Sequence, residues 1–143
     1  MAEPVNVGVL LFVAYRAMEQ RVLDALGTAG FDITPAQARI FQRIGPHGTR
    51  LSELAEQAQV TKQTAGFLVD QLERAGYARR GPDPADARAR LVHIAERGHR
   101  AGEIAAAVVA EVEAEWAGHI GARRLTQLRD TLARLREITD PYI

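Results

Sequence analysis

Cysteine is absent from this 143-residue chain, and serine and lysine occur once each, at Ser52 and Lys62. Without cysteine the chain cannot form disulfides, thiolate metal sites or a thiol sensor of peroxide. It also contains neither a Gly-x-Ser-x-Gly nucleophile turn nor a glycine-rich phosphate loop. The sequence therefore lacks the usual signatures of nucleophilic catalysis, and we predict a protein that is not an enzyme.

Long apolar runs are missing as well. The longest uncharged stretch near the N-terminus is Pro4–Tyr15, twelve residues, whereas a helix that spans a membrane needs about 20 apolar residues. A secretory signal would begin with basic residues, and the first basic residue here is Arg16. We expect a cytoplasmic protein without a membrane partner.

The net charge is zero, from 18 basic and 18 acidic residues, but the charges are unevenly distributed. Residues 74–100 hold seven arginines against three acidic residues, whereas residues 103–115 hold four glutamates and no basic residue. A neutral total thus conceals a basic middle segment. Such a segment is compatible with nucleic-acid binding, because the distribution of charge matters more than its sum.

Apolar residues recur with helical spacing at both ends of the chain. Residues 5–27 have one continuous apolar face, and between Val7 and Tyr15 the helix would be apolar all round, which indicates that it is enclosed from several sides. Residues 96–117 predict a long helix, interrupted by Gly118 and Gly121.

The last predicted helix has the spacing of a coiled-coil seam. Its apolar positions are Leu125, Leu128, Leu132, Leu135 and Ile138. We predict that residues 1–30 and 96–143 form a helical dimerisation region that pairs two chains about a two-fold axis.

Residues 31–95 predict a smaller set of helices, within one compact domain overall. Thr34, Pro35 and Gln37 make a strong helix start, because threonine caps, proline suits the first position and glutamine closes a capping box. Two further short helices are expected at 53–58 and 62–75. Their predicted caps are Ser52 and Thr61.

Two short strands, Tyr77–Arg80 and Arg90–Ile94, follow the helices. The segment between them, Gly81–Asp86, has the composition of a turn and contains two prolines. The predicted fold class is therefore mainly α with a small β-wing (α+β): a winged helix-turn-helix with dimerisation helices at both ends.

A helix-turn-helix places the N-terminal residues of its second helix on base edges in the major groove. The residues offered in this way are Thr61, Lys62, Gln63 and Thr64, and Ser52, at the start of the first helix, is a further candidate DNA contact. Hydroxyl groups suit phosphates, glutamine pairs with adenine, and lysine reaches either guanine or phosphate. Taken singly, each of these residues is better explained as a helix cap or a solvated side chain, but their combined spacing favours DNA contact.

The middle of the chain resembles the multiple-antibiotic-resistance regulator (MarR) family of dimeric winged-helix transcription factors. The resemblance rests on the segments LSELAEQAQVTKQT, LVDQLERAGYARR and DPADARARLV, followed by Glu96-Arg97-Gly98. The wing signature of that family, Asp-x-Arg, is matched by Asp86-Ala87-Arg88. The terminal helices match its dimerisation elements, so the resemblance covers nearly the whole chain.

The resemblance implies that Arg88, at the tip of the wing, enters the minor groove of DNA. It implies that Asp86 supports the wing by holding the Arg88 guanidinium. Arg79, Arg80 and Arg90 are expected to contact phosphates or to support the wing, and a solvated strand face is the alternative for Arg79 and Arg80.

The chain departs from the family pattern at three places. Gln59 stands in a turn where many relatives have glycine, and Ala95 stands where a threonine usually caps the helix after the wing. Gly66-Phe67 replaces a polar or basic pair on the second helix. Phe67 is expected either to meet a thymine methyl group or to pack, so the base specificity of relatives does not transfer.

Members of the family commonly release DNA when a small aromatic, often anionic, molecule binds. Phe12, Tyr15, Arg16 and Phe41 are candidates to line such an effector pocket, in which Arg16 would pair with a carboxylate. For each of them, an aromatic core residue or a solvated arginine is the simpler alternative. We expect no cofactor.

The sequence allows two alternatives to a transcriptional regulator. His93, Glu96 and His99 suggest a metal site, but the Glu-x-x-His pattern of carboxylate-bridged metal sites occurs once where such sites need it twice. We therefore expect no metal. The second alternative is a winged-helix dimer that acts as a protein-interaction adapter without DNA binding.

These features together predict a sequence-specific, homodimeric DNA-binding transcriptional regulator, most simply a ligand-responsive repressor. Its partner would be double-stranded DNA carrying an inverted-repeat operator with half-sites about 10 bp apart.

Overall fold

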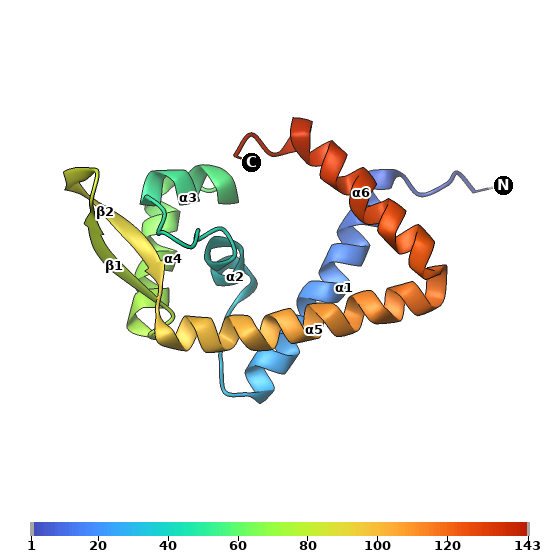
Figure 1. The fold of residues 1–143 in the computed structure, drawn as a ribbon, viewed down its shortest axis with the longest axis horizontal. Helices are drawn as coiled ribbons and strands as arrows, with labels where there is room; N and C mark the ends of the chain where they lie inside the picture. Colours follow the sequence, from blue (N-terminus) through green and yellow to red (C-terminus); the bar gives the residue numbers. More distant parts are fainter. Residues whose placement is uncertain (1, 143) are drawn as a thin grey trace. The chain divides into compact units, whose positions relative to one another are not determined.

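The computed structural model describes residues 2–142, which form six helices and one two-stranded antiparallel sheet (Figure 1). The elements in chain order are α1 (Val7–Thr28), α2 (Pro35–Phe41), α3 (Leu51–Ala58), α4 (Lys62–Arg74), β1 (Ala78–Asp83), β2 (Asp86–Ile94), α5 (Glu96–Ile120) and α6 (Ala122–Thr139). The predicted fold class, mainly α with a small β-wing, is confirmed.

The chain divides into two compact units. The winged unit is Val22–Ala105, which contains α2, α3, α4 and the β1–β2 hairpin. The terminal unit consists of residues 2–21 and 106–142. The predicted dimerisation region began at residue 1 and ended at residue 143, and both of these lie outside the described residues.

The core of the winged unit is built from the apolar stripes of its three short helices and from the hairpin. Its largest fully buried side chains are Tyr77, Ile40, Leu54, Leu72, Val69 and Val92. The helix α4 contributes Ala65, Leu68, Val69 and Leu72, which lie on one face because of their helical spacing. The opposite side of α4 is thereby left to face outward.

Helix starts in the winged unit follow the predicted capping chemistry in two of three cases. Thr34 and Gln37 form the complete capping box at the start of α2, and Thr61 accepts a hydrogen bond from the Thr64 N–H at 3.0 Å. The predicted cap at Ser52 is wrong. Arg50 is the N-cap of α3, because Thr49 is held extended by a β-bridge to Val92 and the helix begins directly afterwards.

The turn between α3 and α4 passes through Gln59 in the left-handed conformation, with φ 56° and ψ 46°. Among the described residues it is the one non-glycine position with positive φ. The Gln59 N–H bonds to the Glu56 carbonyl and the Val60 N–H to the Ala55 carbonyl, so the last carbonyls of α3 are satisfied. These bonds offset a conformational cost of about 1 kcal/mol for a residue with a Cβ atom.

The hairpin is longer than the sequence predicted. Its strands pair from Ala78 with Ile94 to Pro82 with Arg90, and after a register shift Asp83 pairs with Asp86. A six-residue turn was therefore the wrong expectation. Proline is tolerated on an edge strand, and the Asp83 carboxylate closes the turn by accepting the Ala85 N–H at 2.9 Å.

The first turn of α5 is fastened to the rest of the winged unit by Arg97. Its guanidinium lies 4.6 Å from the centre of the Tyr77 ring and 5.3 Å from that of Phe31. It also donates hydrogen bonds to the carbonyls of Ala75 and Gly30, at 2.6 and 3.1 Å. Cation–π contacts and backbone hydrogen bonds thus connect two loops, α1–α2 and α4–β1, to α5, although Ala95 provides no capping side chain.

In the terminal unit, α5 continues through Gly118 to Ile120, so Gly118 does not interrupt it as predicted. A single glycine costs a helix only about 1 kcal/mol, and the break falls at Gly121, whose φ is 92°. Arg21 of α1 pairs with Glu115 of α5 at 2.7 Å. This hydrogen-bonded contact lowers the pKa of the Glu115 carboxyl and raises that of Arg21.

Much of the apolar surface of the terminal unit is exposed. On α1, the side chains of Leu10, Phe12 and Val13 are each more than half exposed. On α6, the seam predicted from leucine spacing is likewise open, and Ile138 is 84% exposed. Even so, in the described part of the chain none of the helices is both long and apolar enough to cross a membrane.

Candidate nucleic-acid interface

The N-terminal turn of α4 presents a row of exposed polar side chains. Thr61, Lys62, Gln63 and Thr64 are all exposed, and the hydroxyl groups of Thr61 and Thr64 lie 2.9 Å apart. Ser52, on the first turn of α3, is exposed as well. The structure therefore presents all five of the polar residues that the sequence singled out in the helix-turn-helix, at the starts of two consecutive helices.

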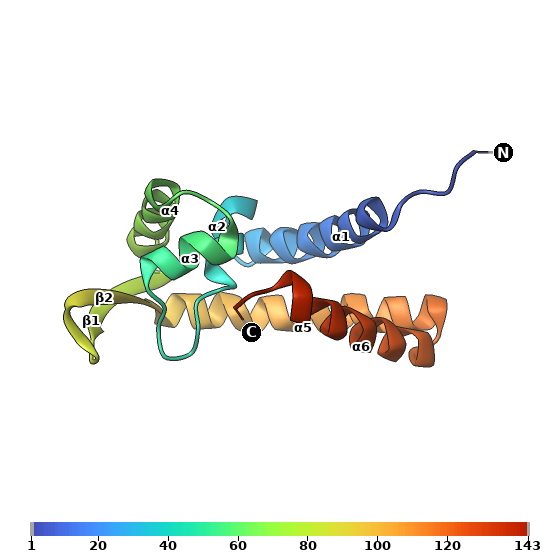
Figure 2. The ribbon, with the colours of Figure 1, turned by 90° about the horizontal axis from the view of Figure 1, so that it is seen from above.

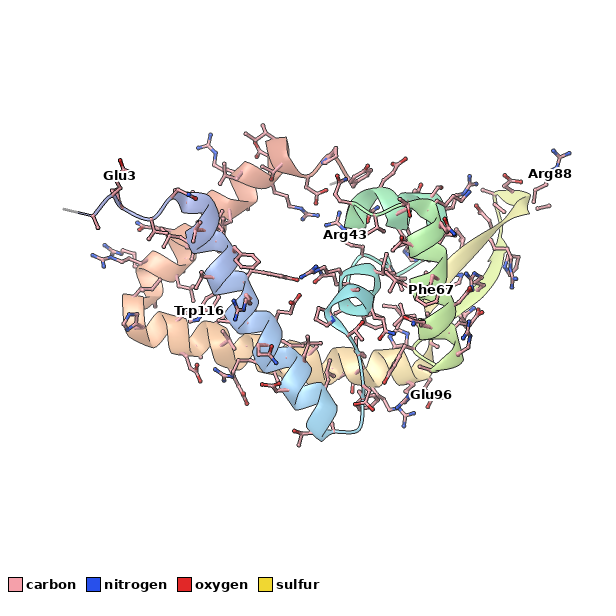
Figure 3. The ribbon with its side chains drawn as sticks, turned by 180° about the vertical axis from the view of Figure 1, so that it is seen from behind. Glu3, Arg43, Phe67, Arg88, Glu96 and Trp116 are labelled. Atoms are coloured by element: carbon pink, nitrogen blue, oxygen red, sulfur yellow. The ribbon has the colours of Figure 1, made fainter. Side chains whose placement is uncertain are left out.

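Phe67 is the exposed aromatic side chain of α4, with 58% of its surface accessible. Successive residues of an α-helix are rotated by about 100°, so Phe67 and Gln63 lie opposite the buried stripe that contains Leu68 and Leu72. The expectation that Phe67 packs in the core is excluded. Figure 3 labels it on α4.

A shallow hollow of 360 Å³ lies beside these helix starts and the hairpin. Its lining residues are Arg50, Leu51, Ser52, Lys62, Arg80, Ala89, Arg90 and Val92. We call it the basic hollow, because four of its eight lining residues are cationic and none is acidic. It brings together Ser52, Lys62 and Arg90, three residues that the sequence predicted as DNA contacts.

Arg50 is a member of the basic hollow that the sequence analysis missed. Its Nε and an Nη atom donate to the same Asp83 carboxylate oxygen, at 3.0 and 2.8 Å. A second carboxylate, that of Asp86, lies 3.8 Å from the same Nη. Arg50 therefore links the start of α3 to the far end of the hairpin. No spacing rule pointed to it, because this contact joins residues 33 positions apart.

The wing tip carries Arg88, which is exposed and projects from the end of the hairpin in Figure 3. The Asp86 carboxylate accepts a hydrogen bond from the Arg88 backbone N–H at 3.0 Å. The expectation that Asp86 holds the Arg88 guanidinium is wrong. Asp86 fixes the backbone of the turn through a contact two residues away, and the guanidinium is left to extend outward.

The remaining arginines of the hairpin differ in their surroundings. Arg80 is bound by Asp70 at 2.9 Å and by Glu73 at 3.1 Å, which ties β1 to α4. It thus supports the hairpin and is poorly placed to contact a phosphate. Arg90 donates to the Arg80 carbonyl at 3.3 Å and remains exposed, as does Arg79.

The Asp83 carboxyl makes wing anchoring dependent on pH. Its hydrogen bond from the Ala85 N–H, and then its contact with Arg50, lower its pKa below the ordinary value of 3.8. A carboxyl with a lowered pKa stabilises the fold fully above that ordinary value and loses the effect as the pH falls through its folded-state pKa. The contribution is thus complete at neutral pH and disappears in acid below pH 3.8.

We therefore expect Asp83→Asn to lower the urea midpoint of unfolding at pH 7 and to change it less at pH 3. The control is Asp32→Asn, which alters an exposed carboxyl of the same unit. Urea titrations of the three proteins at both pH values measure the effect. If Asp83→Asn lowered the urea midpoint by the same amount at both pH values, the carboxylate charge would not anchor the wing.

The four candidate effector residues lie in different units. Phe12, Tyr15 and Arg16 belong to α1 in the terminal unit, where the Tyr15 hydroxyl donates to Glu19 at 2.9 Å. Phe41 ends α2 and packs against the core of the winged unit. The effector pocket remains a prediction. Within residues 2–142, no group of three histidine, cysteine or acidic side chains is arranged to hold a metal ion.

Residues 31–89, which contain the helix starts, most of the hairpin and six of the eight residues that line the basic hollow, match the sequence model of the MarR family. Over these residues the chain is similar to the MarR family. Its MarR fold is that of the family's transcriptional regulators. The resemblance inferred from the helix-turn-helix and the Asp-x-Arg wing signature is thus confirmed.

The similarity to solved structures extends over nearly the whole length of the chain. A transcriptional regulator of Thermotoga maritima is 28% identical, with 93% of each chain covered and a TM-score of 0.64. A MarR-family protein of Mycobacterium tuberculosis, in complex with salicylic acid, is 25% identical over 94% of this chain and 99% of that one, with a TM-score of 0.67. CouR from Rhodococcus jostii RHA1, bound to p-coumaroyl-CoA, is 25% identical over 96% and 94%, with a TM-score of 0.71. A comparison with curated protein sequences found no match.

Proposed function

We propose that this protein is a MarR-type, sequence-specific DNA-binding transcriptional regulator that acts in the cytoplasm as a homodimeric repressor. The observation that carries the proposal is the basic hollow, which adjoins the exposed start of α4 on one side and the hairpin on the other. The exposed side chains of Lys62 and Arg90 can neutralise phosphates there, whereas Arg50 and Arg80 are already paired with carboxylates. The neighbouring polar residues Gln63 and Thr64 are then free to meet base edges.

The projecting wing supplies a second contact with DNA. Arg88 is exposed at its tip (Figure 2 shows the hairpin extending beyond α3 and α4), and the hairpin is anchored by the Arg50–Asp83 contact. A guanidinium presented in this way suits a narrow minor groove, where the negative potential is enhanced. We therefore assign α4 to the major groove and the wing to the adjacent minor groove.

Dimerisation explains the exposed apolar surface of the terminal unit. Side chains such as Phe12 and Val13 on α1 and Leu132 and Ile138 on α6 would otherwise remain in water, and large apolar patches usually mark interaction sites. A second copy of the chain is the simplest occupant, because a two-fold interface buries the same patch on both subunits. Two copies would read an inverted repeat with half-sites about 10 bp apart.

A small effector would relieve repression. The salicylic acid and p-coumaroyl-CoA bound by two of the similar proteins both contain a phenol ring and anionic groups. Arg16 lines a hollow on α1 together with Val13, Ala17 and Gln20, which would suit an aromatic anion. We propose that such a molecule changes the spacing of the two α4 helices in the dimer.

Arg88→Ala is expected to weaken operator binding about 10- to 100-fold, the effect of losing one good groove contact, while the dimer stays intact. Arg100→Ala removes an exposed arginine from α5 and serves as the control, which should bind nearly as tightly as the wild type. Gel-shift titration of a selected duplex measures both. Unchanged binding by Arg88→Ala would remove the wing from the interface. Absence of any DNA binding by the wild type would favour the adapter function instead.

A further inference from the structure

Phe67 is a large aromatic side chain on α4 that lies outside the buried core of the winged unit. It is 58% exposed, and the core side of the helix is already filled by Ala65, Leu68, Val69 and Leu72. Gln63 lies one turn earlier on the same outward face, because residues four apart on a helix are neighbours. Phe67 therefore extends the polar row at the start of α4 by one apolar side chain.

The charges along α4 mark where a DNA-facing segment would end. From Thr61 to Phe67 the helix carries one cation, Lys62, and no acid. Beyond this segment Asp70 and Glu73 follow, and both are held by Arg80 of β1. Carboxylates repel a phosphate backbone. Phe67 is therefore the last outward side chain of α4 before the first carboxylate, that of Asp70.

A phenyl ring can form no hydrogen bond with a base edge, so it selects apolar groups. The apolar group on the major-groove edge of unmodified DNA is the C5 methyl of thymine. We propose that Phe67 is a specificity-determining residue that contacts a thymine C5 methyl group in each operator half-site, next to the base met by Gln63. This proposal rests on the DNA-binding function proposed above.

Replacement of thymine by deoxyuridine, which lacks only the C5 methyl group, tests the contact directly. A duplex selected from random-sequence DNA by the wild-type protein is resynthesised with one deoxyuridine at a time in each half-site. The wild type is expected to bind about five- to tenfold more weakly when one particular thymine per half-site is changed. Phe67→Ala is expected to bind the thymine and deoxyuridine duplexes equally, and Phe67→Leu to retain part of the discrimination.

The matched control is Gln63→Ala, which removes a neighbouring side chain from the same face and should leave the deoxyuridine effect in place. Because Phe67 is exposed, the Phe67 variants should melt within a few degrees of the wild type, which thermal unfolding checks.

Wild-type binding that is indifferent to deoxyuridine at every position, or a Phe67→Ala variant that keeps the wild-type discrimination, would overturn the proposal while leaving DNA binding itself intact. A methyl effect found only at 5-methylcytosine would overturn the assignment to thymine. A wild type that selects no duplex at all would overturn both proposals.

Discussion

Gly98→Ala is expected to destabilise the winged unit by about 3 kcal/mol or more, the upper range for overpacking a filled core. Gly98 is buried in the first turn of α5. A Cβ atom there would overlap the Tyr77 carbonyl oxygen and would lie 2.9 Å from Ile94 Cγ2 and 3.0 Å from Phe41 Cε2. The carbonyl cannot move freely, because it accepts the Ala95 N–H at 3.0 Å.

The control for this prediction lies one turn further along the same helix. Gly102→Ala places a Cβ atom where nothing lies within 4 Å, so the gain in helix propensity should stabilise the protein by about 0.5–1 kcal/mol. Urea or thermal unfolding should show a lower free energy of unfolding than the wild type for Gly98→Ala and a higher one for Gly102→Ala. A Gly98→Ala protein as stable as the wild type would mean that the hairpin, α2 and α5 do not meet at this position.

Replacement of Leu128 and Leu132 by glutamate is expected to abolish the dimer at micromolar concentration. These side chains are 39% and 38% exposed in the single chain, and together with Trp116 and Leu125 they line an apolar hollow of 170 Å³. If a second chain covers this seam, two carboxylates per chain would be buried without partners, at a cost of several kcal/mol each. The expected products are monomers or unfolded chains.

A control with the same change in net charge is Gln127→Glu combined with Arg134→Gln. Both residues are exposed and lie on the side of α6 away from the seam. Sedimentation velocity should show this control as a dimer and the Leu128/Leu132 variant as a smaller species. A stable, DNA-binding dimer of the Leu128/Leu132 variant would show that the dimer interface is elsewhere.

Local sequence rules predicted the helices of the winged unit well. The buried stripe of α4, the capping box at Thr34 and the cap at Thr61 depend on contacts within four residues, which spacing makes visible. The same rules failed where a distant residue decides the outcome. Thr49 is held extended by Val92, which moves the start of α3 away from the cap that Ser52 would have provided.

The candidate DNA interface was predictable in its residue types but not in its connections. The exposed start of α4 and the wing-tip arginine follow from the helix-turn-helix and Asp-x-Arg patterns. The roles of Arg50 and Asp83 do not, because they depend on an ion pair between separate elements. Support of the wing was one of two roles expected for Arg80, but its partner Asp70 on α4 was not foreseen. Asp86 also acts differently from the prediction, since it holds the backbone of Arg88 and leaves the guanidinium unbound by Asp86.

The most direct test of DNA binding is a gel-shift titration of the wild-type protein against the DNA that flanks its own gene, at two salt concentrations. For a protein that makes six to ten phosphate contacts, an increase in salt from 50 to 200 mM weakens binding by about 10³- to 10⁵-fold. We predict tight, fragment-selective binding that falls steeply with salt. Failure to bind these fragments and pooled genomic fragments even at low salt would contradict the account and leave the basic hollow and the exposed start of α4 without a nucleic-acid partner.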